Sequence, residues 1–416
     1  MSPRAPSNRL LLAVLLGALA MIGPFSIDTM FPAFPAIGAD FGVGKLAMQQ
    51  TLSLYLVAYA AMSLFHGPLS DAFGRRRVIL TGVAVFALAS IGCALARDMT
   101  QLLAFRVLQG LSAGTGLIVG RAVIRDCYER DDAQRLMSHV SMIFGIAPAL
   151  APIVGGWILG WAAWPAIFWF LAGWAVLLWL AIALGLPETH PPAHRMPVSP
   201  ASIWHSTRAM LGNHLFLRLA LAGSFNFGAL FLYISSAPAF VLERLGLNEQ
   251  QFGWFFVPTI SGMMAGAWLS GRMAGRMSGT RLANLGFAIC GSALVLNLAY
   301  NLAVSPPRIP LAVMPMTVLA FGIALVFPIL TLAILDMYPR QRGAASSMQM
   351  FVGLVSHTIV AGAISPAVSH DALWLCLVSA VFTAAAWLLW RSYLRRCRVA
   401  PEASPNAPAY EPAGRL

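Results

Sequence analysis

One acidic side chain, Asp28, lies well inside a long apolar segment of this sequence. A carboxyl group at membrane depth is energetically unfavourable and usually functional, and it can carry a proton. Arg106 is the only basic residue deep in an apolar segment, and Gln109 follows about one helical turn later. We expect Asp28 and Arg106 at similar depth, where they could meet or share a water-filled cavity. Asp28, Arg106 and Gln109 are therefore predicted to form a proton-coupling site, with a permanent structural ion pair as the alternative.

The chemistry of such a site depends on whether Asp28 can change its charge. Apolar surroundings favour a neutral carboxyl group, whereas a nearby arginine or a cationic substrate favours the carboxylate. Competition between a proton and a substrate for Asp28 would produce antiport. Gln109 could hydrogen-bond either Arg106 or the substrate.

The composition indicates that these residues are positioned by membrane-spanning helices. The chain has 416 residues, of which 59% are hydrophobic and 10% charged, and this is too apolar for a soluble core. We predict an all-α membrane protein with twelve spans, each long enough to cross about 30 Å of hydrocarbon. The predicted spans are residues 10–32, 48–66, 78–96, 100–122, 136–159, 164–186, 214–238, 250–270, 282–303, 309–334, 345–366 and 372–391.

The basic residues predict how these spans are oriented. With the N-terminus inside, 22 of the 27 Lys and Arg residues fall in cytoplasmic segments and four fall in outer loops. We therefore expect a multi-pass protein of the bacterial inner membrane with both termini in the cytoplasm. The net charge of +12 is then an orientation signal, and no nucleic-acid partner is expected. Neither the five cysteines nor the histidines show a metal-ligand spacing, so no metal or other cofactor is expected.

A polar, proline-rich stretch divides the chain in the middle, with six predicted spans on either side. This pattern is typical of transporters that are built from repeated halves around a central binding site. The predicted domains are an N-terminal six-helix half (1–186), a cytoplasmic linker (187–213), a C-terminal six-helix half (214–392) and a disordered cytoplasmic tail (393–416).

The loop after the second predicted span, residues 67–77, reads GPLSDAFGRRR. It resembles the loop signature of the major facilitator superfamily, from which Ala72 is the one clear departure. Glycine permits a tight turn and close helix approach, and arginines can bind carboxylates across the inner surface. The resemblance predicts a cytoplasmic gating motif consisting of Gly67, Asp71, Gly74, Arg75, Arg76 and Asp126.

Further segments of the first half extend this resemblance. Residues 106–110, RVLQG, resemble the superfamily's helix 4 motif, which is associated with proton coupling. Residues 145–156 resemble its helix 5 antiporter motif, with Gly145, Pro148, Pro152, Gly155 and Gly156 at the matching positions. Residues 26–35, SIDTMFPAFP, resemble the Bcr/CflA drug-resistance branch. The resemblance implies a twelve-helix drug efflux pump that is driven by the proton gradient and acts as a monomer.

The second half offers polar side chains inside apolar segments as candidates for a substrate cavity. Each of them could instead make an ordinary hydrogen bond between helices. The candidates are Asn226, Tyr233, Asn297, Gln349 and His357.

We expect proton-coupled efflux of small amphiphilic drugs, phenicol- or bicyclomycin-like, by alternating access. Some drug antiporters of this type carry a second acidic residue earlier in helix 1, and its absence here makes neutral or zwitterionic substrates more attractive. The alternative is an exporter of an endogenous metabolite, such as an amino-acid derivative or a metallophore. A membrane-embedded enzyme is a remote alternative, because a single embedded carboxylate does not supply paired catalytic groups.

Overall fold

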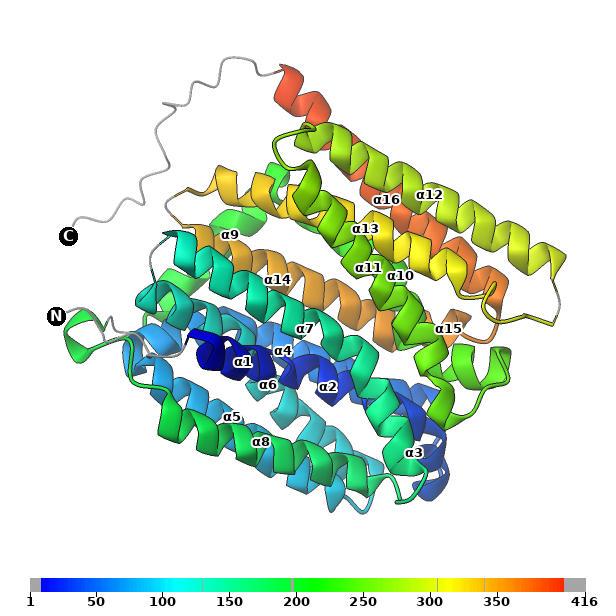
Figure 1. Ribbon diagram of the computed structural model, residues 1–416, viewed down its shortest axis with the longest axis horizontal. Helices are drawn as coiled ribbons and strands as arrows, with labels where there is room; N and C mark the ends of the chain where they lie inside the picture. Colours follow the sequence, from blue (N-terminus) through cyan, green and yellow to red (C-terminus); the bar gives the residue numbers. More distant parts are fainter. Residues whose placement is uncertain (1–8, 129, 196–197, 305, 340, 400–416) are drawn as a thin grey trace.

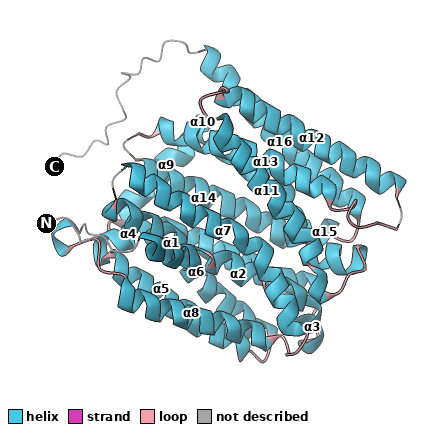
Figure 2. Ribbon diagram, viewed as in Figure 1, coloured by secondary structure: helices cyan, strands magenta, loops and turns pink. Residues whose placement is uncertain are grey.

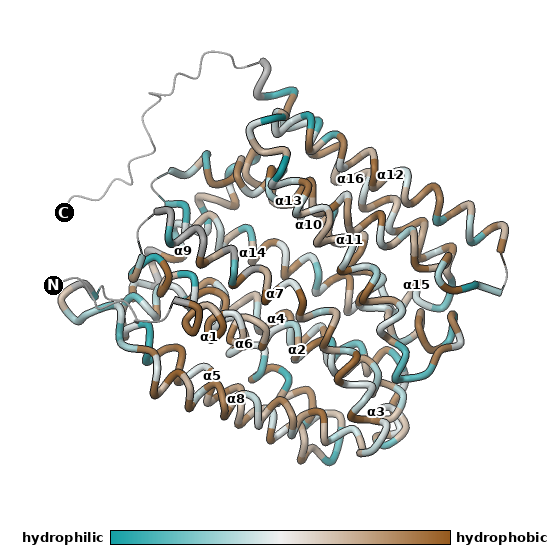
Figure 3. Tube along the Cα trace, in the orientation of Figure 1, coloured by the Kyte–Doolittle hydropathy of each residue, from teal (hydrophilic) through white to brown (hydrophobic). Residues whose placement is uncertain are grey.

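The computed structural model describes the whole chain except residues 1–8, 129, 196–197, 305, 340 and 400–416, and the described residues contain helices but no strands (Figures 1 and 2). Among the described residues, twelve helical spans are long and apolar enough to cross a membrane, and each predicted span overlaps one of them. In Figure 3, hydrophobic residues predominate along the helices and hydrophilic residues are frequent at their ends and connections. The predicted all-α membrane fold with twelve spans is confirmed.

The first span is broken into four short pieces and is longer than predicted, since it runs to Asp40. It consists of α1 (Arg9–Ala20), α2 (Ile22–Asp28), the 3₁₀ turn η1 (Phe31–Ala33) and α3 (Phe34–Asp40). Pro32 lacks the N–H group that would bond to the carbonyl of Asp28 in a continuous helix. Asp28 is therefore the last residue of α2, next to a break in the helix.

The first half continues with α4 (Lys45–Phe73), α5 (Arg75–Ala94), α6 (Met99–Cys127), α7 (Arg130–Leu159) and α8 (Pro165–Gly185). The predicted linker contains the 3₁₀ turn η2 (Pro192–His194) and the helix α9 (Pro200–Gly212). The second half contains α10 (His214–Ser235), η3 (Ala239–Arg244), η4 (Glu249–Gln251), α11 (Gly253–Met273), α12 (Gly279–Ala303), α13 (Met314–Met337), α14 (Arg342–Ile359), η5 (Val360–Ile364), α15 (Ser365–Val368) and α16 (Ala372–Val399).

Two features differ from the predicted organisation. The segments η3 and η5 are π-helices, which continue α10 and α14 with a different hydrogen-bond register. Helix α16 extends to Val399, beyond the predicted start of the tail at residue 393. Residues 400–416, which make up the rest of the predicted tail, lie outside the described residues.

Within each half the helices pack closely, as α4 and α5 do on α6, and α11 and α12 on α13. The halves meet mainly through α4 against α14 and η5, and through α7 against α11 and η4 (Figure 1). We call the end of the bundle that carries the α4–α5 turn and the linker the linker end. The other end, which carries η3 and η4, is the opposite end.

Candidate proton-coupling site and gating motifs

Arg106 is fully buried on α6, with 0% of its surface exposed. Its Nη1 donates to the carbonyl of Ser26 (3.0 Å), to the Ser26 hydroxyl (2.8 Å) and to Oε1 of Gln109 (2.7 Å). Its Nε donates to the carbonyl of Thr51 (3.2 Å), and the guanidinium lies 4.4 Å from the centre of the Tyr55 ring. Arg106 therefore ties α2 and α4 to α6 through groups that carry no full negative charge.

Asp28 is also buried, with 4% of its surface exposed, but it makes no hydrogen bond or ion pair with any other described residue. Arg106 binds Ser26, two residues before Asp28, yet Asp28 and Arg106 form no ion pair with each other. The permanent ion pair considered from the sequence is thus not formed in this structure. The carboxyl group thus lies two residues from a partner of the guanidinium without being part of its hydrogen-bond network.

Gln109 is held in one orientation by two neighbours on α5. Its Nε2 donates to the Ser90 hydroxyl (2.8 Å), and its Oε1 accepts from Arg106 and from the Cys93 thiol (3.7 Å). One guanidinium nitrogen of Arg106, Nη2, has no hydrogen-bond partner. The site therefore combines a carboxyl group that can take up a proton without losing a hydrogen bond and a buried donor without a hydrogen-bond partner.

At the linker end, Arg75 is buried and contacts the carboxylates of the predicted gating motif. It forms ion pairs with Asp71 and with Asp126, whose Oδ2 lies 3.0 Å from Nε, and it donates to the Ser70 hydroxyl. Gly74 has φ +97°, a conformation that glycine adopts without strain. The structure thus brings Asp71, Gly74, Arg75 and Asp126 together. Gly67 lies inside α4, where an added Cβ would meet open space, so its role in a tight turn is not supported.

The sequence analysis missed Glu188, the second residue of the linker. Its Oε1 accepts from the backbone N–H of Arg75 (2.9 Å) and from that of His190 (3.0 Å). A carboxylate at this position caps the first turn of α5, where N–H groups lack helical partners. A Cβ at Gly74 would meet the Glu188 carboxylate, so a larger residue there would require that side chain to shift.

Two more contacts attach the end of the first half to the same motif. The Thr189 hydroxyl donates to Oδ2 of Asp126 (3.3 Å), and Arg76 donates through Nη2 to the carbonyl of Ala183 (2.6 Å). The beginning of the linker therefore docks on the gating motif. In the sequence, only a Pro-Glu-Thr run after an apolar span marks the residues that make these contacts. Nothing in the sequence indicates which turn they contact.

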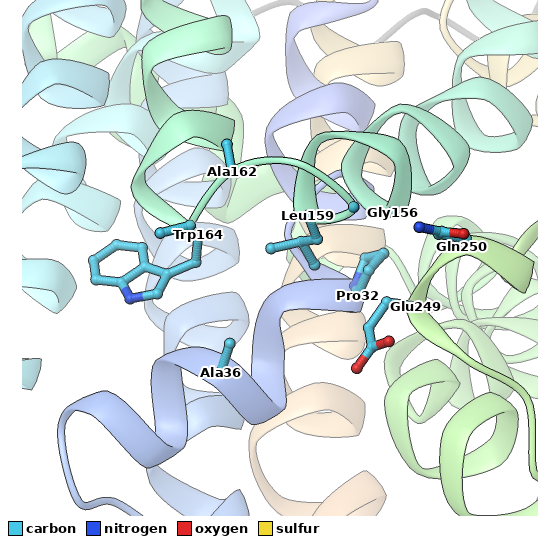
Figure 4. A pocket seen from close by; sticks show the side chains of 10 residues that line it. Pro32, Ala36, Gly156, Leu159, Ala162, Trp164, Glu249 and Gln250 are labelled. Carbon is cyan, nitrogen blue, oxygen red and sulfur yellow. The ribbon is translucent and has the colours of Figure 1, made fainter.

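The antiporter motif lies in α7, which remains helical through Pro148 and Pro152. A Cβ at Gly155 would collide with the carbonyl of Thr29, and one at Gly156 with the carbonyl of Glu249. The lack of a side chain at Gly155 allows the broken first span to pack against α7. The lack of one at Gly156 allows η4 of the other half to do the same (Figure 4). At Gly145 a Cβ would meet open space, so close packing does not require glycine there.

The polar candidates of the second half separate into two kinds. Asn297 donates to the Tyr233 hydroxyl (2.7 Å), and Gln349 donates to the Thr331 hydroxyl (3.0 Å). The candidates Tyr233, Asn297 and Gln349 therefore make hydrogen bonds between helices. By contrast, Oδ1 of Asn226 and Nε2 of His357 are buried without a hydrogen-bond partner. The His357 ring lies 4.7 Å from the Phe231 ring and 5.2 Å from the Phe227 ring, centre to centre.

The halves are closed against each other at the opposite end. Lys45 and Glu243 form an ion pair (2.7 Å), and the rings of Phe31 and Phe256 are stacked 6.4 Å apart. A pocket of about 320 Å³ remains between the halves there. Figure 4 shows its wall, formed by the end of α7, η1, α3 and η4; the residues that line it are Pro32, Ala36, Gly156, Leu159, Gly160, Ala162, Ala163, Trp164, Glu249 and Gln250.

Comparison with known proteins gives the family. Residues 15–361 match the family described as Major Facilitator Superfamily. The uncharacterized MFS-type transporter YdgK of Bacillus subtilis is 37% identical over 270 residues, which are 64% of this chain and 67% of that protein. The bicyclomycin resistance protein homolog of Haemophilus influenzae is 30% identical over 300 residues, 71% of this chain and 75% of that protein.

A solved structure shares the fold across nearly the whole chain. It is a bacterial homolog of the human lysosomal transporter Spinster, with a TM-score of 0.71 and 18% identity, and the match covers 93% of this chain and 97% of the other. This likeness confirms the fold. The family match and the named relatives confirm the superfamily and the drug-resistance branch that the sequence motifs predict. The chain is a multi-pass protein of the bacterial inner membrane.

Proposed function

Because this chain belongs to the Major Facilitator Superfamily, we propose that it exports small amphiphilic drugs, of the bicyclomycin or phenicol type, in exchange for protons. The observation that carries the proton-coupled part is Asp28. It is a buried carboxyl group without a partner among the described residues, at a break in the first span, two residues from Ser26, which binds Arg106. A permanently paired carboxylate could not serve as a proton carrier without first breaking its ion pair.

Asp28 would exchange a proton for substrate during each cycle. A carboxyl group in apolar surroundings is more stable neutral unless a cation or a hydrogen-bond donor faces it. Protonation at the outer side would release the substrate, and binding of a new substrate at the inner side would release the proton. Arg106 would favour the ionised form only when the side chains approach, because its present partners are Ser26, Thr51 and Gln109.

The two ends of the bundle would act as alternating gates. We assign the linker end to the cytoplasm, since it carries a dense group of basic residues, including Arg75, Arg76, Arg77 and Arg125. The opposite end then faces the periplasm and is closed by the ion pair of Lys45 and Glu243. On this assignment, the structure represents a state with a closed outer gate.

The substrate would be recognised by polar groups that the protein leaves unpaired. Arg106 Nη2 offers a donor, Asn226 Oδ1 offers an unpaired acceptor, and His357 Nε2 is an unpaired polar atom beside the Phe231 ring. Such a set suits an uncharged molecule with both hydroxyl or amide groups and an apolar surface. The name of the Haemophilus influenzae relative supports bicyclomycin as the first compound to test.

The experiment is a tolerance screen in a strain that lacks its native pumps. Expression of the wild-type chain should raise tolerance to bicyclomycin or a phenicol, and an ionophore that collapses the pH gradient should abolish drug extrusion from loaded cells. Extracellular metabolites are measured in the same cultures. Enrichment of an amino-acid derivative without any change in drug tolerance would favour the endogenous-metabolite exporter instead.

A further inference from the structure

Gln49 and Gln50, near the start of α4, bind directly to the second half. The side-chain amide of Gln49 donates to the carbonyl of Ser235 (2.9 Å) and to the Ser365 hydroxyl (3.4 Å). The amide of Gln50 donates to the carbonyl of Gly362 (3.3 Å). Within the described part of the chain, these bonds and the Lys45 ion pair are the side-chain hydrogen bonds that join the two halves.

The acceptors lie where the helices of the second half depart from regular α-helical bonding. Ser235 ends α10, and Gly362 lies in the π-helix η5. A Cβ at Gly362 would lie 2.6 Å from the Ser53 hydroxyl, so glycine allows α4 to approach η5 closely. The hydroxyls of Ser236 and Ser365 are hydrogen-bonded to each other (2.7 Å) and connect the two helix ends.

The same few residues of α4 also hold the candidate proton-coupling site. Arg106 donates to the carbonyl of Thr51, which is one residue from Gln50 and two from Gln49. The Ser53 hydroxyl donates to the carbonyl of Gln49 (3.0 Å), so it bonds within the same turn of the helix. One short stretch of α4, residues 49–53, therefore binds Arg106 on one side and the second half on the other.

We propose that Gln49 and Gln50 are positioning residues that couple the state of Arg106 to closure of the opposite end; this inference rests on the proposed transport function. When Arg106 turns toward ionised Asp28 or toward a ligand, it releases the Thr51 carbonyl and frees this turn of α4. The two amides then lose their acceptors, and the halves separate at the opposite end. Packed interfaces of this kind switch between discrete arrangements, so a small shift at one site can select the other state.

The test measures the shape of the protein rather than its flux. Spin labels are introduced as unnatural amino acids at Ala39 and Arg244, exposed residues of the two halves at the opposite end, so that the native cysteines remain. The populations of short and long distances give the closed and open states. The variant pair Gln49→Met and Gln50→Met removes the donors at similar side-chain volume. Gln101→Met, at an exposed glutamine that binds only within its own half, is the matched control.

We expect Gln50→Met to raise the ratio of open to closed protein by about fivefold, the effect of one ordinary hydrogen bond, Gln49→Met to raise it by at least as much, and the control to leave it unchanged. Gly362→Ala keeps both glutamines and should open the same end, since its Cβ forces η5 away from Ser53. Unchanged populations in the glutamine variants would overturn the proposal.

The coupling itself is tested with Arg106→Lys in both backgrounds. If residues 49–53 transmit the state of Arg106, the effect of Arg106→Lys on the open population should shrink when both glutamines are methionine. If Arg106→Lys changes the open population equally in both backgrounds, the two glutamines hold the opposite end closed independently of Arg106. That result would refute the coupling. Neither result requires transport to be observed, so the coupling and the proposed drug export can fail separately.

Discussion

Arg106 binds Ser26 and not Asp28, although the two lie only two residues apart on α2. Its Nη1 is 3.0 Å from the Ser26 carbonyl and 2.8 Å from the Ser26 hydroxyl. The arginine therefore fixes the helix that carries the carboxyl group while leaving that group free to change its charge. A site built in this way can exchange a proton without first breaking an ion pair.

This geometry predicts the stability of an Arg106→Met variant. Methionine removes a buried charge that has no ion-pair partner, but it also removes the donor to Ser26, Thr51 and Gln109. The variant should therefore lose only about 1–3 kcal/mol of unfolding free energy, while drug efflux is lost. A permanent pair with Asp28 would instead lower the unfolding free energy by about 3–5 kcal/mol, because it would leave an uncompensated carboxylate. Thermal unfolding in detergent distinguishes the two, with Arg106→Lys as the variant that keeps the charge.

The glycines of α7 offer a prediction with an internal control. Gly156→Ala places a Cβ against the backbone carbonyl of Glu249, which cannot move aside as a flexible side chain would. We expect the opposite end to be held partly open and transport to fall by at least tenfold. Gly145→Ala, in the same helix, meets open space and should transport normally. Equal loss in both variants would mean that helix flexibility matters, and not the contact between the halves.

The first residues of the linker should affect the rate of the cycle. Glu188→Ala removes the acceptor for the Arg75 N–H and should lower turnover several-fold with little change in substrate affinity, because the gating motif lies at the other end of α4 from Thr51, which binds Arg106. Glu188→Gln keeps an acceptor oxygen and should restore part of the rate. Glu249→Gln, an exposed glutamate at the opposite end, is the control. A changed substrate Kd with normal turnover would contradict a gating role.

The unpaired polar atoms of the second half predict opposite effects at two asparagines. Asn226 leaves Oδ1 buried without a partner, so Asn226→Leu should preserve or increase stability while it weakens substrate binding. Asn297 donates to Tyr233, and Asn297→Leu should lower the unfolding free energy by about 1–3 kcal/mol, because the hydroxyl loses its partner. Binding and unfolding are measured on the same purified samples. Unaltered substrate affinity in Asn226→Leu would remove this residue from the proposed binding site.

Hydropathy and charge were sufficient to predict the twelve spans, because each span must itself contain enough consecutive apolar residues to cross the hydrocarbon core. The sequence also indicated Asp28 and Arg106, since ionisable residues at membrane depth are rare. It could not indicate that Arg106 uses the carbonyls of Ser26 and Thr51, because every residue has a carbonyl group and only the packing decides which one is reached.

Contacts between distant segments were missed for the same reason. Glu188 and Gln49 resemble ordinary polar residues near the ends of spans, and their partners lie 113 and 186 residues away. Gly145 and Gly156 belong to one motif, yet only Gly156 faces a backbone that a Cβ would hit. The π-helices η3 and η5 depend on how helix ends pack, and no local residue pattern indicated them.

The most direct test is substrate flux in proteoliposomes with an imposed pH gradient and a pH-sensitive dye inside. Wild-type protein should move bicyclomycin or a phenicol against its gradient, with protons moving in the opposite direction. Asp28→Asn should fold and exchange labelled for unlabelled substrate at equilibrium, but it should show neither uphill transport nor substrate-dependent proton flux. Uphill transport at the wild-type rate by Asp28→Asn would contradict the assignment of Asp28 as the proton carrier.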